Sequence, residues 1–137
     1  MTNDELRIVQ AARKWVGTKF HHQGRKKNIG VDCIGLWVGV AREIGLSVDD
    51  ELDYPREPNG GRLELALEEY LVESELKIGG VGLFKIKNEP QHVGIFSDYG
   101  DDIGLIHAYA QARKVAEHRL DDFWRDKLVR CFEFPMI

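Results

Sequence analysis

The 137-residue sequence lacks long apolar runs, large basic blocks and any leader-like start. No apolar stretch approaches the roughly 18 residues that a membrane helix needs, so we expect no membrane partner. The net charge is -4, and the only basic cluster is the short run at 25–27. This charge balance argues against nucleic acid as a partner. The first residues do not resemble a signal peptide, so we expect synthesis in the cytoplasm and release only through a carrier or lysis.

Cysteine is scarce, with only Cys33 and Cys131. A chain that can build its own core does not need one disulfide, so we expect two free thiols. Neither cysteine lies in a Cys-x-x-Cys motif, so nothing indicates a zinc ribbon or a thioredoxin-like site. A zinc site formed by Cys33, His92 and His107 is open on ligand type alone, but the spacing does not require it. We therefore expect no metal and no cofactor.

Composition and patterning predict one α+β domain over residues 1–137. The apolar fraction of 43% and charged fraction of 31% are those of a globular protein. Apolar periodicity predicts helices at about 2–16, 32–44 and 63–71, with loops at 17–31 and 46–61. Short β-branched and aromatic runs predict strands at 81–87, 92–97, 105–110, 114–120 and 128–134, with a turn at 88–90 and a helical turn at 121–126. Without helix-length connections these strands must pair antiparallel, so N-terminal helices pack on a C-terminal antiparallel sheet of about five strands.

Cys33 is the first candidate for chemistry, because a glycine-containing loop leads to it and a helix starts with it. Free backbone N–H groups and the helix dipole favour an anion at a helix start. We therefore expect the pKa of the Cys33 thiol to be lowered from about 8.5, and the same N–H groups to receive an oxyanion. The alternative is a small buried core residue.

His92 and His107 are candidate partners for Cys33. His92 begins a predicted strand beside Gly94, where another group can approach closely, and this suits a general base. His107 belongs to a later strand, and antiparallel pairing of the two strands would place it beside His92 to fix the imidazole tautomer. For each histidine the alternative is a half-buried, hydrogen-bonded strand residue.

Other polar and thiol groups show weaker signals. His22 lies in the loop before Cys33 and is a candidate for the wall of the cleft. His118 alternates with polar residues, so we expect it to be solvated. Cys131 lies among alternating apolar residues on the last strand, so we expect it to pack in the core.

Four segments in order resemble the NlpC/P60 cysteine peptidases. They are Gly-Thr-Lys-Phe-His-His-Gln-Gly at 17–24, Val-Asp-Cys-Ile-Gly-Leu at 31–36, His-Val-Gly-Ile-Phe at 92–96 and Ile-His-Ala at 106–108. The resemblance extends over about 7–135 and is closest to phage-type members associated with tails and gene-transfer particles, including the segments 53–63 and 130–135. It implies a papain-like α+β fold, a Cys–His–polar triad and cleavage of peptide stems in bacterial cell wall.

The resemblance assigns roles to individual residues. It implies Cys33 as nucleophile, His92 as base and His107 as the third polar residue. It also implies that Asp32 neutralises the free amine of a peptide stem. Many members carry a tyrosine where this chain has Phe20 and a serine where it has Ile34. These two differences put the usual preference for an N-terminal alanine–glutamate stem in doubt.

The predicted function is hydrolysis of an amide in the peptide stem of peptidoglycan through an acyl-enzyme on Cys33. The resemblance implies the bond between γ-D-glutamate and the diamino acid, whereas the residues alone imply only acyl transfer. A phage particle would explain export and would add other tail proteins as partners. The alternatives are a structural tail-tip protein with weak or no activity, and a related thiol amidase or acyltransferase.

Overall fold

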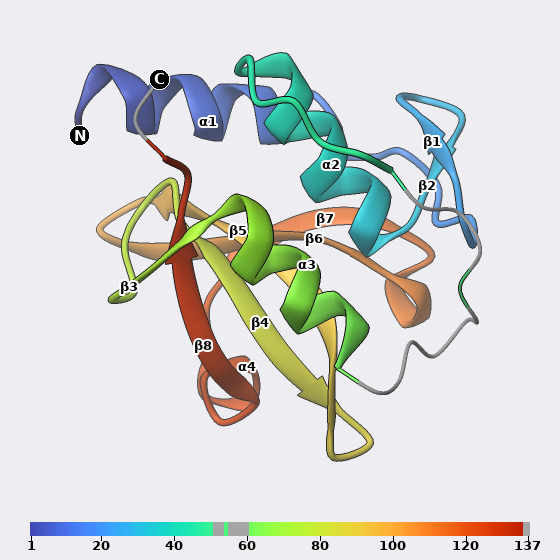
Figure 1. Ribbon diagram of the computed structural model, residues 1–137. Coiled ribbons are helices and arrows are strands. Elements are labelled where there is room, and N and C mark those ends of the chain that lie inside the picture. Colours follow the sequence, from blue (N-terminus) through green and yellow to red (C-terminus); the bar gives the residue numbers. More distant parts are fainter. Residues whose placement is uncertain (51–53, 55–60, 136–137) are drawn as a thin grey trace.

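A computed structural model describes residues 1–50, 54 and 61–135 (Figure 1). Its helices are α1 (Asn3–Arg13), α2 (Cys33–Glu43), α3 (Arg62–Tyr70) and α4 (Asp122–Arg125), with a 3₁₀ turn at Ala110–Ala112. Its strands are β1 (Arg25–Lys26), β2 (Gly30–Val31), β3 (Val72–Ser74), β4 (Val81–Ile86), β5 (Glu89–Tyr99), β6 (Asp102–Tyr109), β7 (Lys114–Arg119) and β8 (Leu128–Glu133). No helix in these ranges is long and apolar enough to span a membrane.

The strands β3 to β8 form one antiparallel sheet in the order β3-β8-β4-β5-β6-β7. The prediction of an α+β fold with an antiparallel sheet is confirmed. The sheet has one strand more than expected, because the three residues of β3 pair with β8 and are too few to show a pattern. The predicted loop at 17–31 also holds the short β1–β2 hairpin. The loop predicted at 46–61 lies partly outside the described residues.

Local sequence signals account for the ends of the elements. Thr2 and Glu5 form the capping box that starts α1, with reciprocal hydrogen bonds of 3.1 and 2.7 Å. The turn predicted at 88–90 is displaced. The β4–β5 hairpin turns at Lys87 and Asn88, whose φ angles of 52° and 66° suit a primed turn, while the two residues that follow already belong to β5.

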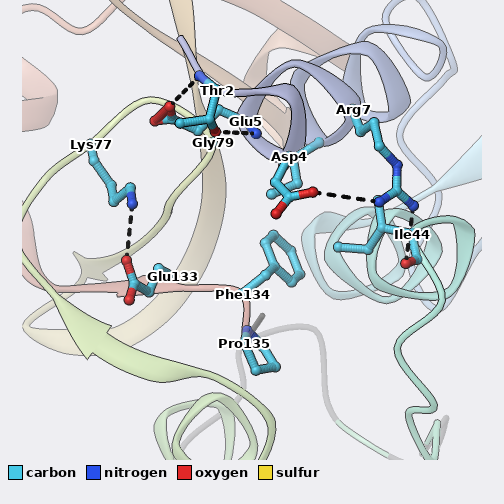
Figure 2. A pocket seen from close by; sticks show the side chains of 11 residues that line it. Thr2, Asp4, Glu5, Arg7, Ile44, Lys77, Gly79, Glu133, Phe134 and Pro135 are labelled. Carbon is cyan, nitrogen blue, oxygen red and sulfur yellow. Dashed lines mark hydrogen bonds and ion pairs between the residues drawn. The ribbon is translucent and has the colours of Figure 1, made fainter. Parts of the chain in front are cut away.

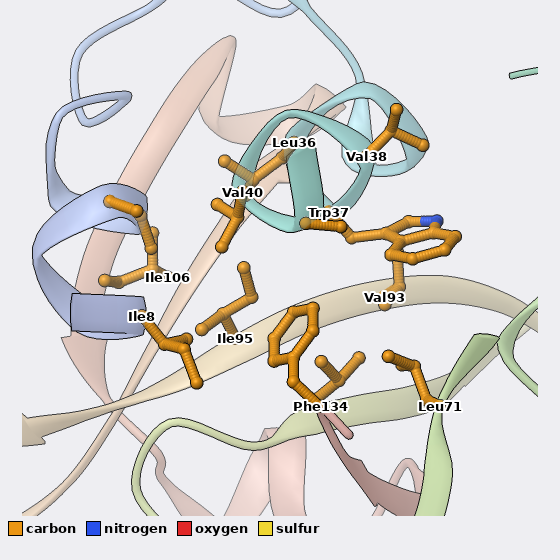
Figure 3. Close-up of a cluster of buried hydrophobic side chains, with 14 of the residues drawn as sticks. Ile8, Leu36, Trp37, Val38, Val40, Leu71, Val93, Ile95, Ile106 and Phe134 are labelled. Carbon is orange, nitrogen blue, oxygen red and sulfur yellow. The ribbon is translucent and has the colours of Figure 1, made fainter. Parts of the chain in front are cut away.

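The sheet has two different faces. α1 and α2 cover one face and bury a mainly aliphatic core that includes Ile8, Val40, Ile95 and Ile106 (Figure 3). The other face carries a smaller cluster that is rich in aromatic side chains. Its buried members are Phe84, Phe96, Leu105, Leu120 and Trp124.

A pocket of about 310 Å³ lies where the start of α1 meets the C-terminal end of α2 and the end of β8 (Figure 2). Its charged side chains pair with each other, with 3.7 Å between Arg7 and Asp4 and 3.0 Å between Lys77 and Glu133. The 11 residues of α2 separate this pocket from the first turn of the helix by about 16 Å. It is therefore distinct from the cavity beside Cys33.

Candidate active site

Cys33 is the first residue of α2, as predicted. Asp32 caps the helix by accepting a hydrogen bond of 2.8 Å from the backbone N–H of Gly35. A Cβ atom at Gly35 would collide with the carbonyl oxygen of Gly24, so glycine lets the preceding loop pack on the first turn. The loop and the cap together fix where the cysteine lies.

Cys33 and His92 line one cavity of about 360 Å³. The cavity brings together the predicted nucleophile, base and substrate-side residues, although they come from distant parts of the chain. His107 does not line it and lies behind His92. The wall is formed by Phe20, His22, Asp32, Cys33, Ile34, Tyr54, Ile86, Lys87, Gln91, His92 and residues 108–111.

The sulfur of Cys33 lies against the backbone on both sides of His92. Sγ is 4.0 Å from the carbonyl oxygen of Gln91, and the backbone N–H of Val93 also interacts with it. Within the described residues no hydrogen bond joins Sγ to the ring of His92. The two side chains thus form parts of one cavity wall.

The prediction of an acidic thiol at Cys33 is wrong for this structure. Burial, followed by the carboxylate of Asp32, raises the pKa of Cys33 to about 12. The nearby backbone N–H groups and Arg25 lower the pKa, but by less. The residue that caps the helix therefore adds negative charge next to the sulfur, and the thiol is neutral at pH 7. The expectation that both cysteines are free thiols is confirmed.

Three histidines form a continuous row of hydrogen bonds. His92 Nε2 lies 2.7 Å from His107 Nδ1, and His107 Nε2 lies 2.8 Å from His118 Nε2. His118 Nδ1 lies 2.8 Å from the carbonyl oxygen of Arg119. The expected pairing of His92 with His107 is present. The prediction that His118 is only solvated is wrong, because it is partly buried and bonded to His107.

The row lies among aromatic rings. The ring of Trp124 meets His107 edge-on, with centroids 4.7 Å apart, and lies 5.3 Å from His92, while Phe84 lies 6.0 Å from His92. Burial lowers the pKa of His92 to about 4. Burial, followed by the proximity of His92 and His118, lowers the pKa of His107 to about 2. Both rings are therefore neutral at pH 7.

The carboxylate of Asp32 is fully engaged. Four donors reach its two oxygens: the backbone N–H groups of Gln23 and Gly35, Nη1 of Arg25 and the hydroxyl of Tyr54. Arg25 also pairs with Asp50 at 2.7 Å, so it bridges two carboxylates. A substrate amine would have to replace one of these donors, and the role of Asp32 in binding an amine stays a prediction.

Sequence reasoning missed Tyr54 in the cavity wall and His118 in the histidine row. Tyr54 lies in the segment 53–63 that carries part of the resemblance, but this resemblance assigned it no role. His118 could have been found, because alternation along β7 together with pairing to β6 places it on the same face as His107. In the part of the chain that the structure describes, no group of three or more His, Cys, Asp or Glu side chains is arranged to hold a metal ion.

Comparisons with known proteins place these features in a family. The model of the NlpC/P60 family matches residues 17–133. An NLP/P60 family protein from Staphylococcus aureus, described as similar to lipoprotein, superposes with a TM-score of 0.70 at 19% identity over 100% of this chain and 43% of that one. An NlpC/P60 family protein from Bacillus cereus gives a TM-score of 0.67 at 17% identity over 95% of this chain and 40% of that one.

A third structure is the NlpC/p60 domain of the peptidoglycan hydrolase SagA, with a TM-score of 0.64 at 20% identity over 95% of this chain and 98% of that one. A comparison with curated proteins found no match. At these identities the solved structures establish the fold alone. The chain spans less than half the length of the first two, and about the whole length of the third.

Proposed function

The chain belongs to the NlpC/P60 family, and from this premise we propose that it is a cysteine peptidase that hydrolyses an amide bond in the peptide stem of bacterial peptidoglycan. The observation that carries the proposal is the cavity in which Cys33, at the start of a helix, and His92, on a strand, form a common wall. The description of one structural relative as a peptidoglycan hydrolase supports the substrate class.

In this mechanism Cys33 attacks the carbonyl carbon of the amide as His92 Nδ1 takes the thiol proton. The C–S bond forms, the C–N bond breaks, and His92 returns the proton to the leaving amine. Water then hydrolyses the thioester, again with His92 as base. Backbone N–H groups in the first turn of α2 stabilise the oxyanion.

The charge states favour proton transfer that accompanies the attack. A thiol with a pKa of about 12 and an imidazole with a pKa of about 4 do not form a stable ion pair before the substrate arrives. His107 accepts the N–H of His92 Nε2 and holds the ring in position, which is the third role in a nucleophile–base–orienter triad.

The finer parts of the proposal rest on sequence resemblance. They are cleavage between γ-D-glutamate and the diamino acid, transport in a phage particle, and other tail proteins as partners. None of the three solved relatives is described as a phage protein. Since Asp32 already pairs with Arg25, recognition of a free stem amine by Asp32 also rests on the resemblance.

Digestion of purified peptidoglycan, with mass analysis of the fragments, tests the proposal. We expect new stem fragments from the parent, loss of these fragments with Cys33→Ala, and parent-like digestion with Cys131→Ala as the matched control. Activity of Cys33→Ala within tenfold of the parent would exclude Cys33 as the nucleophile. A parent that releases nothing would favour the structural tail-tip alternative, and release of whole stems from glycan would favour an amidase.

A further inference from the structure

The sheet register places one histidine from each of β5, β6 and β7 on the same face. Phe96 of β5 pairs with Leu105 of β6, and Leu105 pairs with His118 of β7. His92 and His107 each lie an even number of residues from these pairs, so their side chains point to the same face. Diagonal neighbours on adjacent strands are within reach of long side chains, and the hydrogen-bonded row follows from this.

The far end of the row has a fixed proton. A backbone carbonyl can only accept a hydrogen bond, so the 2.8 Å contact between His118 Nδ1 and the carbonyl oxygen of Arg119 requires the proton on Nδ1. In a neutral imidazole the other nitrogen then carries the lone pair. His118 Nε2 is therefore the acceptor that faces His107.

The same donor–acceptor argument applies to His107 and then to His92. His107 Nε2 must donate to His118 at 2.8 Å, which leaves the lone pair of His107 on Nδ1. His92 Nε2 must in turn donate to His107 Nδ1 at 2.7 Å, which leaves the lone pair of His92 on Nδ1. This nitrogen makes no hydrogen bond with the described residues, and it is the atom that a general base in the cavity needs.

We propose that His118 is a positioning residue that fixes the tautomers of His107 and His92, so that His92 presents an unprotonated Nδ1 to the cavity. The low pKa values of His92 and His107 agree with neutral rings at these two positions. The use of His92 Nδ1 as a base rests on the proposed peptidase function, whereas the assignment of the tautomers does not.

The row also allows a positive charge to move away from His92 after His92 takes the proton of Cys33. When His92 Nδ1 gains the thiol proton, the proton on Nε2 can shift to His107 Nδ1, and the proton on His107 Nε2 can shift to His118. The positive charge then lies on the most exposed of the three rings, and no proton is gained or lost. Return of the proton to the leaving amine reverses the same shifts.

Nitrogen-15 NMR of the imidazole rings in the full chain tests the tautomers without any need for activity. At about pH 8, where imidazoles are neutral, we expect the proton on Nε2 of His92, on Nε2 of His107 and on Nδ1 of His118. In His118→Ala we expect His107 and His92 to become tautomer mixtures. A proton on Nδ1 of His92 in the parent, or unchanged tautomers in His118→Ala, would overturn the proposal.

Kinetics then tests the consequence. The loss of one hydrogen bond in the row is expected to lower kcat/KM of His118→Ala on a stem peptide by about 2- to 12-fold. His118→Gln should recover most of it, because the amide oxygen can accept from His107. His21→Ala is the matched control, since His21 Nδ1 also bonds a backbone carbonyl oxygen, that of His22 at 2.9 Å, but within the described residues its ring bonds no other histidine ring.

The two assays separate the two proposals. If the parent cleaves no peptide, the peptidase proposal fails while the NMR result still decides the tautomers. If the parent cleaves and His118→Gln is as impaired as His118→Ala, or His118→Ala is unimpaired, the positioning role is wrong.

Discussion

The two faces of the sheet use neighbouring residues for different purposes. On β6, Ile106 points into the aliphatic core under α1 and α2, and His107 points to the opposite face among histidines and aromatic rings. Both side chains are buried, with exposed fractions of 0% for Ile106 and 1% for His107. Equal burial therefore does not mean an equal role.

The faces differ in what burial demands. Aliphatic side chains require only volume and contact, so many combinations can fill the helix-covered face. A buried imidazole nitrogen that does not face the cavity requires a hydrogen-bond partner, and a missing partner costs about 1–3 kcal/mol. The face that carries the histidines is consequently held by specific hydrogen-bonded pairs.

The largest effect is expected at His92. Replacing it with Gln removes the proposed base, so kcat/KM should fall by about 10²- to 10⁴-fold. His107→Gln should be milder, because an amide oxygen can still accept the proton of His92 Nε2. Steady-state kinetics on one stem peptide measures both. Equal losses of kcat/KM in the two variants would contradict the assignment of His92 as base and His107 as orienting residue.

Ile106→Ala should show the opposite behaviour. Removing this side chain from the aliphatic face is expected to cost about 2–5 kcal/mol of unfolding free energy, through lost burial and a cavity. The kcat/KM of the folded fraction should stay within a few-fold of the parent. Urea unfolding and kinetics on the same preparation test this, and a large kinetic loss without destabilisation would show that the faces are not independent.

The pH dependence of stability should come from the histidine face. Native His92 and His107 have pKa values of about 4 and 2, so the unfolded chain, with histidine near 6.5, binds more protons as pH falls below about 6.5. The unfolding free energy should therefore drop by up to about 1.4 kcal/mol per pH unit for each histidine between pH 6.5 and 5.

Urea titrations at several pH values measure this slope. The double variant His92→Gln/His107→Gln is the control, and it should lose the part of the slope that these two rings supply. An unchanged slope would mean that both rings titrate normally in the folded protein.

The smallest effect is expected at Phe20, which lines the cavity on the helix side and packs against the aliphatic core. If a hydroxyl here contacts the substrate or oxyanion, Phe20→Tyr should raise kcat/KM by about 2- to 12-fold, the value of one neutral hydrogen bond. A fall on every stem peptide tried would show that Phe20 shapes an apolar pocket for another substrate.

Much of the fold and part of the site could be predicted from the sequence. Periodicity determined the helix-covered face, because the side of an element that is buried follows from the spacing of its apolar residues. The positions of Cys33 on a helix start and of His92 and His107 on strands followed from the same signals. The three-residue β3 and the two-residue strands β1 and β2 were beyond this reasoning, since they are too short to show a period.

Only the tertiary structure decided the chemical state of these residues. The raised pKa of Cys33 depends on burial and on Asp32, and Asp32 is in turn held by Arg25 and Tyr54. The place of His118 in the row depends on the register between β6 and β7. The protonation state and tautomer of a side chain are set by the groups that surround it in space. These groups come from segments far apart in the sequence, and the sequence alone does not give the distances between them.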